Sequence, residues 1–168
     1  ISESVFSLGN GKFGQRGNFE EYFSGESLRG NYLGGVYYPD KTRVGWWKNG
    51  YPEYFAKVLN APDWNGIRIK INNQELDPHR LVLSDFRREL NMQNGTLSKF
   101  YTAQFPDGKQ IKIHSTRLLS IVNDELGAIK YSITPLNFSG TIELLLPIDG
   151  DVKNEDANYD EQFWIEIE

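Results

Sequence analysis

The stretch GIRIKINN, residues 66–73, decides the fold. Three isoleucines alternate with the charged Arg68 and Lys70, and the pair Asn72-Asn73 ends the run. Successive side chains of a strand point to opposite faces, so this alternation predicts a strand with one apolar face. The two asparagines predict a tight turn into a second strand.

The same pattern of strand and turn continues toward the C-terminus. Asn94-Gly95 and Pro106-Asp107-Gly108 predict turns between β-prone runs. Strands are predicted at residues 81–85, 96–105, 111–114, 128–134 and 141–146, with the last two forming a pair. Helix signals are weak, and the best candidate is residues 53–60, closed by Pro62. We therefore expect an all-β fold, an antiparallel β-sandwich.

Residues 1–64 have a different character. They hold 14 of the 23 aromatic residues, and residues 1–50 hold 10 of the 16 glycines. Their apolar spacing fits neither helix nor strand, so we expect ordered loops and short strands held by aromatic packing. The 168 residues are predicted to form one domain: this loop-rich part, antiparallel strands over 65–148, and an acidic segment over 149–168.

Composition excludes several classes of protein. The net charge of −5 argues against nucleic-acid binding through phosphates, and no apolar run is long enough to span a membrane. Cysteine is absent, which excludes disulfides and thiolate metal sites. The acidic segment carries eight carboxylates against Lys153, and we expect it to be solvated, except that Phe163-Trp164-Ile165 should dock on an apolar surface.

Few motifs point to chemistry. Residues 9–14 match the dinucleotide pattern G-x-G-x-x-G, but no helix is predicted after them, which favours a glycine turn. His79 and His114 lack the paired spacing of zinc ligands, so no metal site is predicted. Glu20-Glu21 could supply carboxylates for glycosidase chemistry, but neighbours on a strand point apart, and we favour capping or salt-bridge roles.

An aromatic run beside amide and cationic groups is the clearest binding signal. It comprises WWKNGYP, residues 46–52. Sugar rings stack on aromatic faces and hydrogen bond to polar neighbours, although tryptophans also serve as packing or interface anchors. The candidate carbohydrate-binding residues are Trp46, Trp47, Tyr51 and Trp64.

Several runs together resemble a known family. SVFSLGNG at residues 4–11, GQRGNFEE at 14–21 and SLRGNY at 27–32 are similar to the start of glycoside hydrolase family 65 proteins. VGWW at 44–47 is similar to the maltose-phosphorylase branch in particular, and DFRRELNM at 85–92 matches a later family segment. The resemblance covers most of the chain.

The resemblance implies a non-catalytic N-terminal module of the β-supersandwich type, here a truncated part of it. In the family an (α/α)6 barrel carries the general acid and the phosphate site, and we expect the 168 residues not to include it. The barrel performs inverting phosphorolysis of α-linked glucose disaccharides to β-glucose 1-phosphate, with inorganic phosphate as co-substrate and no cofactor. We therefore expect the chain alone to be inactive and to have no catalytic residue. The alternative is a free-standing carbohydrate-binding β-sandwich.

The resemblance also implies partners. The module would support the chain's own barrel and an α-glucoside site, and it would contribute to a homo-oligomer, for which a dimer is expected. Arg16, Asn18, Glu20 and Arg29 lie in the motif-rich loops and are the candidates for these domain contacts. A cytoplasmic location is expected, with a periplasmic or secreted one as the alternative.

Overall fold

A computed structural model describes residues 2–42, 52–154, 162–165 and 167. The chain is almost entirely β, as predicted. One short helix, α1 (Ser2–Val5), precedes the strands. The strands are β1 (Leu8–Gly9), β2 (Phe13–Gln15), β3 (Asn31–Leu33), β4 (Tyr37–Lys41), β5 (Tyr54–Val58), β6 (Arg68–Ile71), β7 (Gln74–Glu75), β8 (Val82–Asn91), β9 (Thr96–Gln104), β10 (Gln110–Leu119), β11 (Gly127–Pro135) and β12 (Ile142–Leu145).

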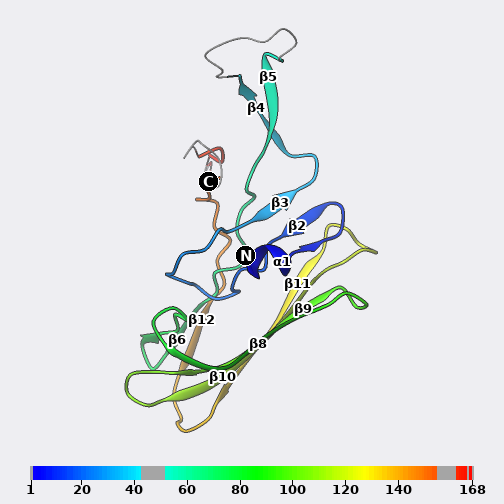
Figure 1. Cartoon of the computed structure of the whole chain (residues 1–168). Coiled ribbons are helices and arrows are strands. Elements are labelled where there is room, and N and C mark those ends of the chain that lie inside the picture. The colour runs from blue at the N-terminus through cyan, green and yellow to red at the C-terminus, as the bar shows by residue number, and fades with distance from the viewer. Residues whose placement is uncertain (1, 43–51, 155–161, 166, 168) are drawn as a thin grey trace.

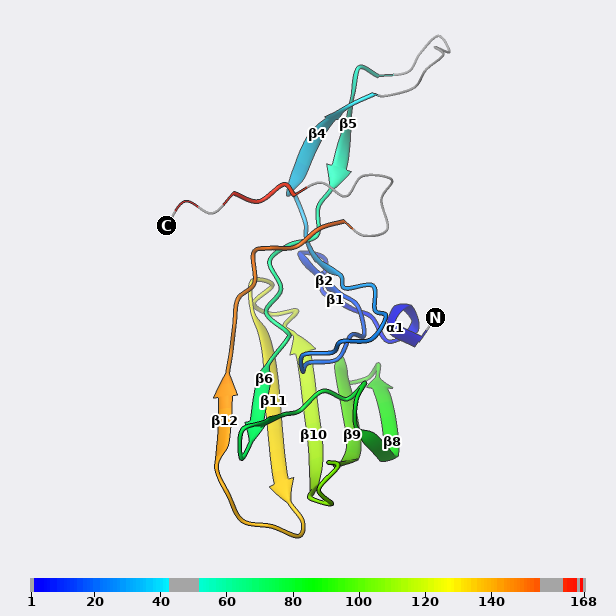
Figure 2. The ribbon, with the colours of Figure 1, turned by 90° about the vertical axis from the view of Figure 1, so that its left-hand side faces the viewer.

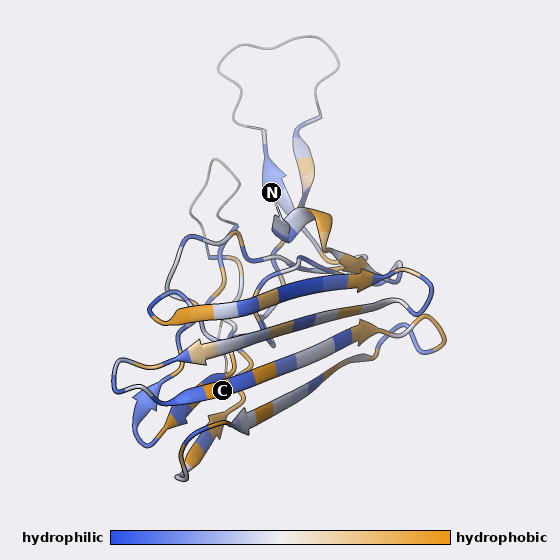
Figure 3. Ribbon diagram, turned by 60° about the horizontal axis from the view of Figure 1, so that its bottom comes forward, coloured by the Kyte–Doolittle hydropathy of each residue, from blue (hydrophilic) through white to orange (hydrophobic). Residues whose placement is uncertain are grey.

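Two antiparallel sheets form the body of the molecule (Figures 1 and 2). One has the order β11-β10-β9-β8 and the other the order β12-β6-β7. The isoleucines of residues 67–71 face Tyr101, Ala103, Ile111 and Ile113 in a common core. Apolar and polar residues alternate along these strands, as the colours in Figure 3 show, because only one face of each strand reaches the core.

The predicted turns are confirmed by backbone geometry. Asn72 and Asn73 both have positive φ, as do Gly95 and Gly108. The predicted pairing of 128–134 with 141–146 is wrong: β11 pairs with β10, and β12 pairs with β6 in the other sheet. The intervening turn therefore carries the chain from one sheet to the other.

The predicted helix at residues 53–60 is also wrong. Residues Tyr54–Val58 form β5, which pairs with β4 in a two-stranded ribbon that projects from the body (Figure 2). Tyr, Phe and Val favour strands, and pairing with a neighbouring strand overrides the weak helical signal. We call this ribbon the arm. A third small sheet, β1-β2-β3, and the loops around it make up the rest of the N-terminal part, as expected.

None of the helices in the described residues is long and apolar enough to cross a membrane.

Candidate functional site

A buried ionic cluster lies between the loop at residues 18–22 and the four-stranded sheet. It consists of Glu20, Glu21, Lys99 and Arg117, whose side chains are at most 2% exposed. The Lys99 Nζ donates hydrogen bonds to Glu20, over 2.5 Å, and to Glu21. The Arg117 Nε lies 3.0 Å from the other Glu20 oxygen. Two cations thus neutralise two carboxylates inside the protein.

Hydroxyl groups complete the ionic cluster. Ser115 Oγ donates to Glu20 over 2.8 Å, and Tyr101 OH donates to Glu21 over 2.9 Å. Tyr131 OH, from β11, donates to the same Glu21 oxygen. Buried charges are tolerated only when they are paired and hydrogen bonded, and these donors meet that requirement for the two carboxylates. Arg117 Nε and Nη1 are buried and have no hydrogen-bond partner among the described residues.

The electrostatics of the ionic cluster rule out proton donation by Glu20. Burial by itself raises the pKa of Glu20, but the charges of Lys99 and Arg117 and the hydrogen bonds outweigh it and hold the pKa at about 2. Burial and the neighbouring Glu21 raise the pKa of Tyr101. Glu20 is therefore ionised near neutral pH, whereas a general acid must carry a proton there. The ionic cluster is suited to holding structure and not to glycoside cleavage.

The prediction about Glu20 and Glu21 was half right. The salt-bridge role is confirmed. The expectation that the two side chains point apart is wrong, because this segment is a loop with only an isolated bridge from Glu21 to Ile67 and both carboxylates reach Lys99. Strand alternation does not apply to loops.

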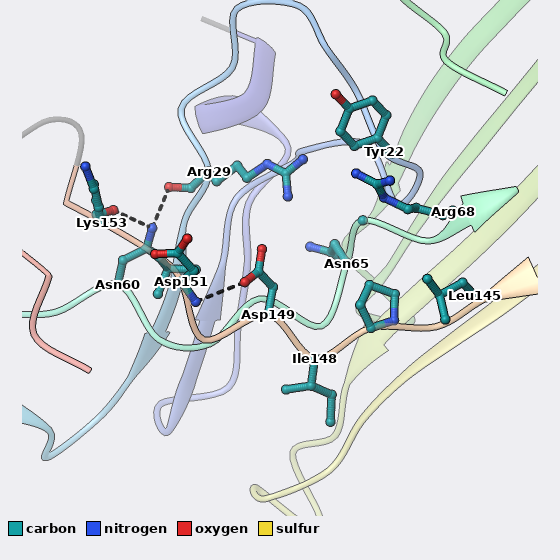
Figure 4. A pocket seen from close by; sticks show the side chains of 13 residues that line it. Tyr22, Arg29, Asn60, Asn65, Arg68, Leu145, Ile148, Asp149, Asp151 and Lys153 are labelled. Carbon is teal, nitrogen blue, oxygen red and sulfur yellow. Dashed lines mark hydrogen bonds between the residues drawn. The ribbon is translucent and has the colours of Figure 1, made fainter. Parts of the chain in front are cut away.

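A polar pocket of about 460 Å³ lies next to this loop (Figure 4). Asp63, which is 2% exposed, bonds two of its lining residues, Arg29 and Asp149. The Asp63 carboxylate accepts hydrogen bonds from Arg29 Nη1 at 2.7 Å and from Asn31 Nδ2 at 2.8 Å. Its backbone pairs in both directions with Asp149. These contacts hold three segments together: residues 29–31, the segment after β5 and the segment after β12.

The pocket wall combines donors and acceptors. Arg68 lies over the Tyr22 ring at 4.8 Å, and the carboxylates of Asp149 and Asp151 face the same space (Figure 4). Asn65 is buried, and its Oδ1 has no hydrogen-bond partner among the described residues. Such a mixture suits a neutral ligand with many hydroxyls, or a polar loop of protein, better than it suits an anion.

The four predicted domain-contact residues lie in one region, and the contacts recorded for them are internal. Arg16 Nη2 donates to Ser4 Oγ over 2.9 Å, and Asn18 Nδ2 donates to the Leu28 carbonyl over 2.9 Å. Glu20 belongs to the ionic cluster, and Arg29 lines the pocket. Their role toward another domain stays a prediction.

Of the predicted carbohydrate-binding residues, the described part of the chain includes Trp64. Trp46, Trp47 and Tyr51 fall outside the described residues. Trp64 is half-buried, and its ring lies so near Gly127 that a Cβ there would come within 2.9 Å of it. Trp64 therefore packs against the start of β11, and sugar stacking by it stays a prediction.

Sequence reasoning missed Lys99, Arg117 and Asp63. One signal was present: Lys99 occupies the same strand face as Leu97 and Tyr101, where an apolar residue belongs. A charged residue at such a position indicates a buried partner. Within the described part of the chain, no group of three or more His, Asp or Glu side chains could hold a metal ion.

Residues 1–168 match the family "Glycosyl hydrolase family 65, N-terminal domain". The chain belongs to this family. The family 65 resemblance of the N-terminal motifs is thereby confirmed over the whole chain.

Several curated relatives are named as phosphorylases. The chain is 49% identical to maltose phosphorylase of Bacillus subtilis (strain 168), over 99% of the chain and 22% of that protein. It is 32% identical to alpha,alpha-trehalose phosphorylase of Thermoanaerobacter brockii, over 91% of the chain and 20% of that protein. The family 65 chain thus spans about a fifth of the length of these relatives.

A solved structure has the same fold. It is described as "Putative kojibiose phosphorylase from human microbiome", with a TM-score of 0.80 and 30% identity. The match covers 90% of this chain and 20% of that one. The all-β sandwich architecture of the family 65 domain is therefore shared with a solved relative.

Proposed function

We propose that residues 1–168 are the non-catalytic N-terminal module of a longer family 65 phosphorylase acting on an α-linked glucose disaccharide, with maltose as the preferred substrate. The observation that carries this is the 49% identity to a maltose phosphorylase across 99% of the chain. The trehalose phosphorylase relative is 32% identical over a similar length.

The reaction would take place outside this module. Phosphate attacks the anomeric carbon while a general acid protonates the leaving oxygen; the glycosidic C–O bond breaks, giving β-glucose 1-phosphate and free glucose. Phosphate is the co-substrate, and no cofactor is needed. The ionised, enclosed Glu20 supports a module that supplies no such acid.

The module would support the catalytic domain and a dimer, in a cytoplasmic enzyme. Its motif-rich loops end in internal contacts beside the pocket, and β4 pairs with β5 in the arm, so both are preformed surfaces. A second candidate function is carbohydrate binding by the module itself. The unpaired Asn65 Oδ1 within a wall of mixed donors and acceptors favours this candidate.

The test assays the full-length protein and the 168-residue chain with maltose, trehalose and kojibiose, each with and without phosphate. We expect phosphate-dependent β-glucose 1-phosphate from maltose with the full-length protein and no turnover by the chain alone. Glucose release independent of phosphate would contradict phosphorolysis, and turnover by the chain alone would contradict the non-catalytic role.

A further inference from the structure

The arm has two faces of different character. Residues directly opposite each other in an antiparallel pair share a face, so the register places Tyr37 beside Val58, Pro39 beside Ala56, and Lys41 beside Tyr54. We call this set the apolar arm face. The opposite face carries Tyr38, Asp40, Phe55 and Lys57.

The opposite face already has a partner within the chain. Phe163, from the C-terminal segment, packs against Tyr38 with the two rings tilted by 49° and their centroids 4.6 Å apart. Lys57 Nζ lies 4.9 Å from the Phe163 ring centre and 3.5 Å from Asp40. The side chains of Asp40 and Lys57 are only 14% and 13% exposed as a result.

The apolar arm face is open to solvent. Tyr37 is 54% exposed, Tyr54 52% and Val58 48%. Pro39 and Ala56 between them are exposed as well. A two-stranded ribbon is marginally stable alone in water, and this one projects from the body with five apolar or aromatic side chains on one face (Figure 2). Such a contiguous patch indicates an interaction surface.

We propose that the apolar arm face is the docking surface for the polypeptide that follows Glu168 in the full-length protein. This inference rests on the proposed function, in which the relatives' additional four-fifths of length is also present here. The C-terminal segment already lies at the arm: Phe163 packs on part of the opposite face, where Tyr38 and Phe55 remain 42% and 44% exposed, and Trp164 Nε1 donates to the Asn60 carbonyl over 2.7 Å at the arm's base.

Two further side chains of this segment are apolar and exposed. Ile165 is 85% exposed and Ile167 is 91% exposed. Packing of the following polypeptide would cover both. The partner surface should be apolar, with one carboxylate or carbonyl to receive Lys41 at the edge of the patch.

The test places a photoreactive benzoylphenylalanine at Tyr54 in the full-length protein and maps the cross-links by mass spectrometry. Benzoylphenylalanine at Tyr38 is the matched control, because it lies on the other face of the same ribbon and should cross-link to residues 162–167. At Tyr54 we expect an intramolecular cross-link to residues beyond 168, with the mass of a single chain.

Three results would overturn the proposal. A product of twice the chain mass would assign the apolar arm face to a second copy. A cross-link to an added protein would assign it to a foreign partner. No cross-link at Tyr54, while Tyr38 still reacts with residues 162–167, would show that the face stays open. Because phosphorolysis is assayed separately, an inactive protein with the expected cross-link would contradict the proposed function and leave the docking surface standing.

Discussion

Lys99→Met tests whether the ionic cluster stabilises the fold. Methionine keeps most of the side-chain volume and removes the charge. Glu20 would then keep Arg117 and Ser115, and Glu21 would keep only its tyrosine donors. Removing one partner of a buried ion pair costs about 3–5 kcal/mol, because the remaining charge stays buried without compensation.

The pKa of Glu20 leads to a similar magnitude. Its environment lowers the pKa from 4.5 to about 2, which corresponds to about 3 kcal/mol favouring the charged form. Lys99 is the largest favourable contributor to that shift. A loss of about 3 kcal/mol should speed hydrogen exchange of protected amides by roughly 150-fold.

The assay is amide hydrogen exchange of the full-length protein, followed on peptides covering residues 96–104 and 110–119. The control is Lys112→Met, an exposed lysine on β10, which should change exchange little. Equal exchange rates in the two variants would refute the reasoning. The double variant Glu20→Gln with Lys99→Met should recover part of the loss, because Lys99→Met alone leaves two carboxylates with one cation.

Four further predictions follow from the same contacts. The pKa of Glu20 is lowered on folding, so its stabilising contribution is present above about pH 4.5 and is lost as the pH falls toward 2; acid unfolding of Glu20→Gln should be less steep over that range. Gly17→Ala would bring a Cβ within 3.0 Å of the Phe6 carbonyl and should lower the free energy of unfolding, measured by thermal unfolding, by about 1–3 kcal/mol. Gly14→Ala is the control: the nearest neighbour of its Cβ would be 3.7 Å away, so the same measurement should show a smaller loss. Arg29→Ala leaves the buried Asp63 without its cation and should cost about 2 kcal/mol by chemical denaturation, with the exposed Arg87→Ala as control. Maltose titrated into the 168-residue chain should leave tryptophan fluorescence unchanged; a saturable response lost in Trp46→Ala and Trp47→Ala would favour carbohydrate binding by the module.

The sequence predicted those parts of the fold whose signals are local. Alternation in residues 67–71 and 111–113 and the positive-φ turns depend on neighbouring residues, and these were confirmed. The strand at 54–58 was missed because its partner strand decides its state. The pairing of β11 and β12 was missed because adjacency in sequence does not determine which sheet a strand joins.

The ionic cluster shows a second limit on sequence-based prediction. Glu20 and Lys99 are 79 residues apart, and neither residue alone indicates the other. The Glu20-Glu21 pair and the lysine on an apolar strand face are each visible in the sequence. The sheet register aligns Lys99 with Ser115 and places Arg117 two residues farther along β10, and the backbone bonds of Glu20 and Tyr22 to Ile67 bring the loop to them.

The ionic cluster explains how the loop at residues 18–22, which has no regular strand, can hold one wall of the polar pocket in place. The Glu20 carbonyl accepts the Ile67 amide at 2.8 Å, and the Tyr22 amide donates to the Ile67 carbonyl at 3.0 Å, which ties the loop to the β6 side. The Glu20 side chain and the Asn18 carbonyl meanwhile bind Lys99 and Arg117 of the four-stranded sheet. The loop is therefore fixed to both layers of the sandwich at residues 18–22, immediately before Tyr22 enters the pocket wall. Loosening the ionic cluster should consequently disturb the pocket as well as the core.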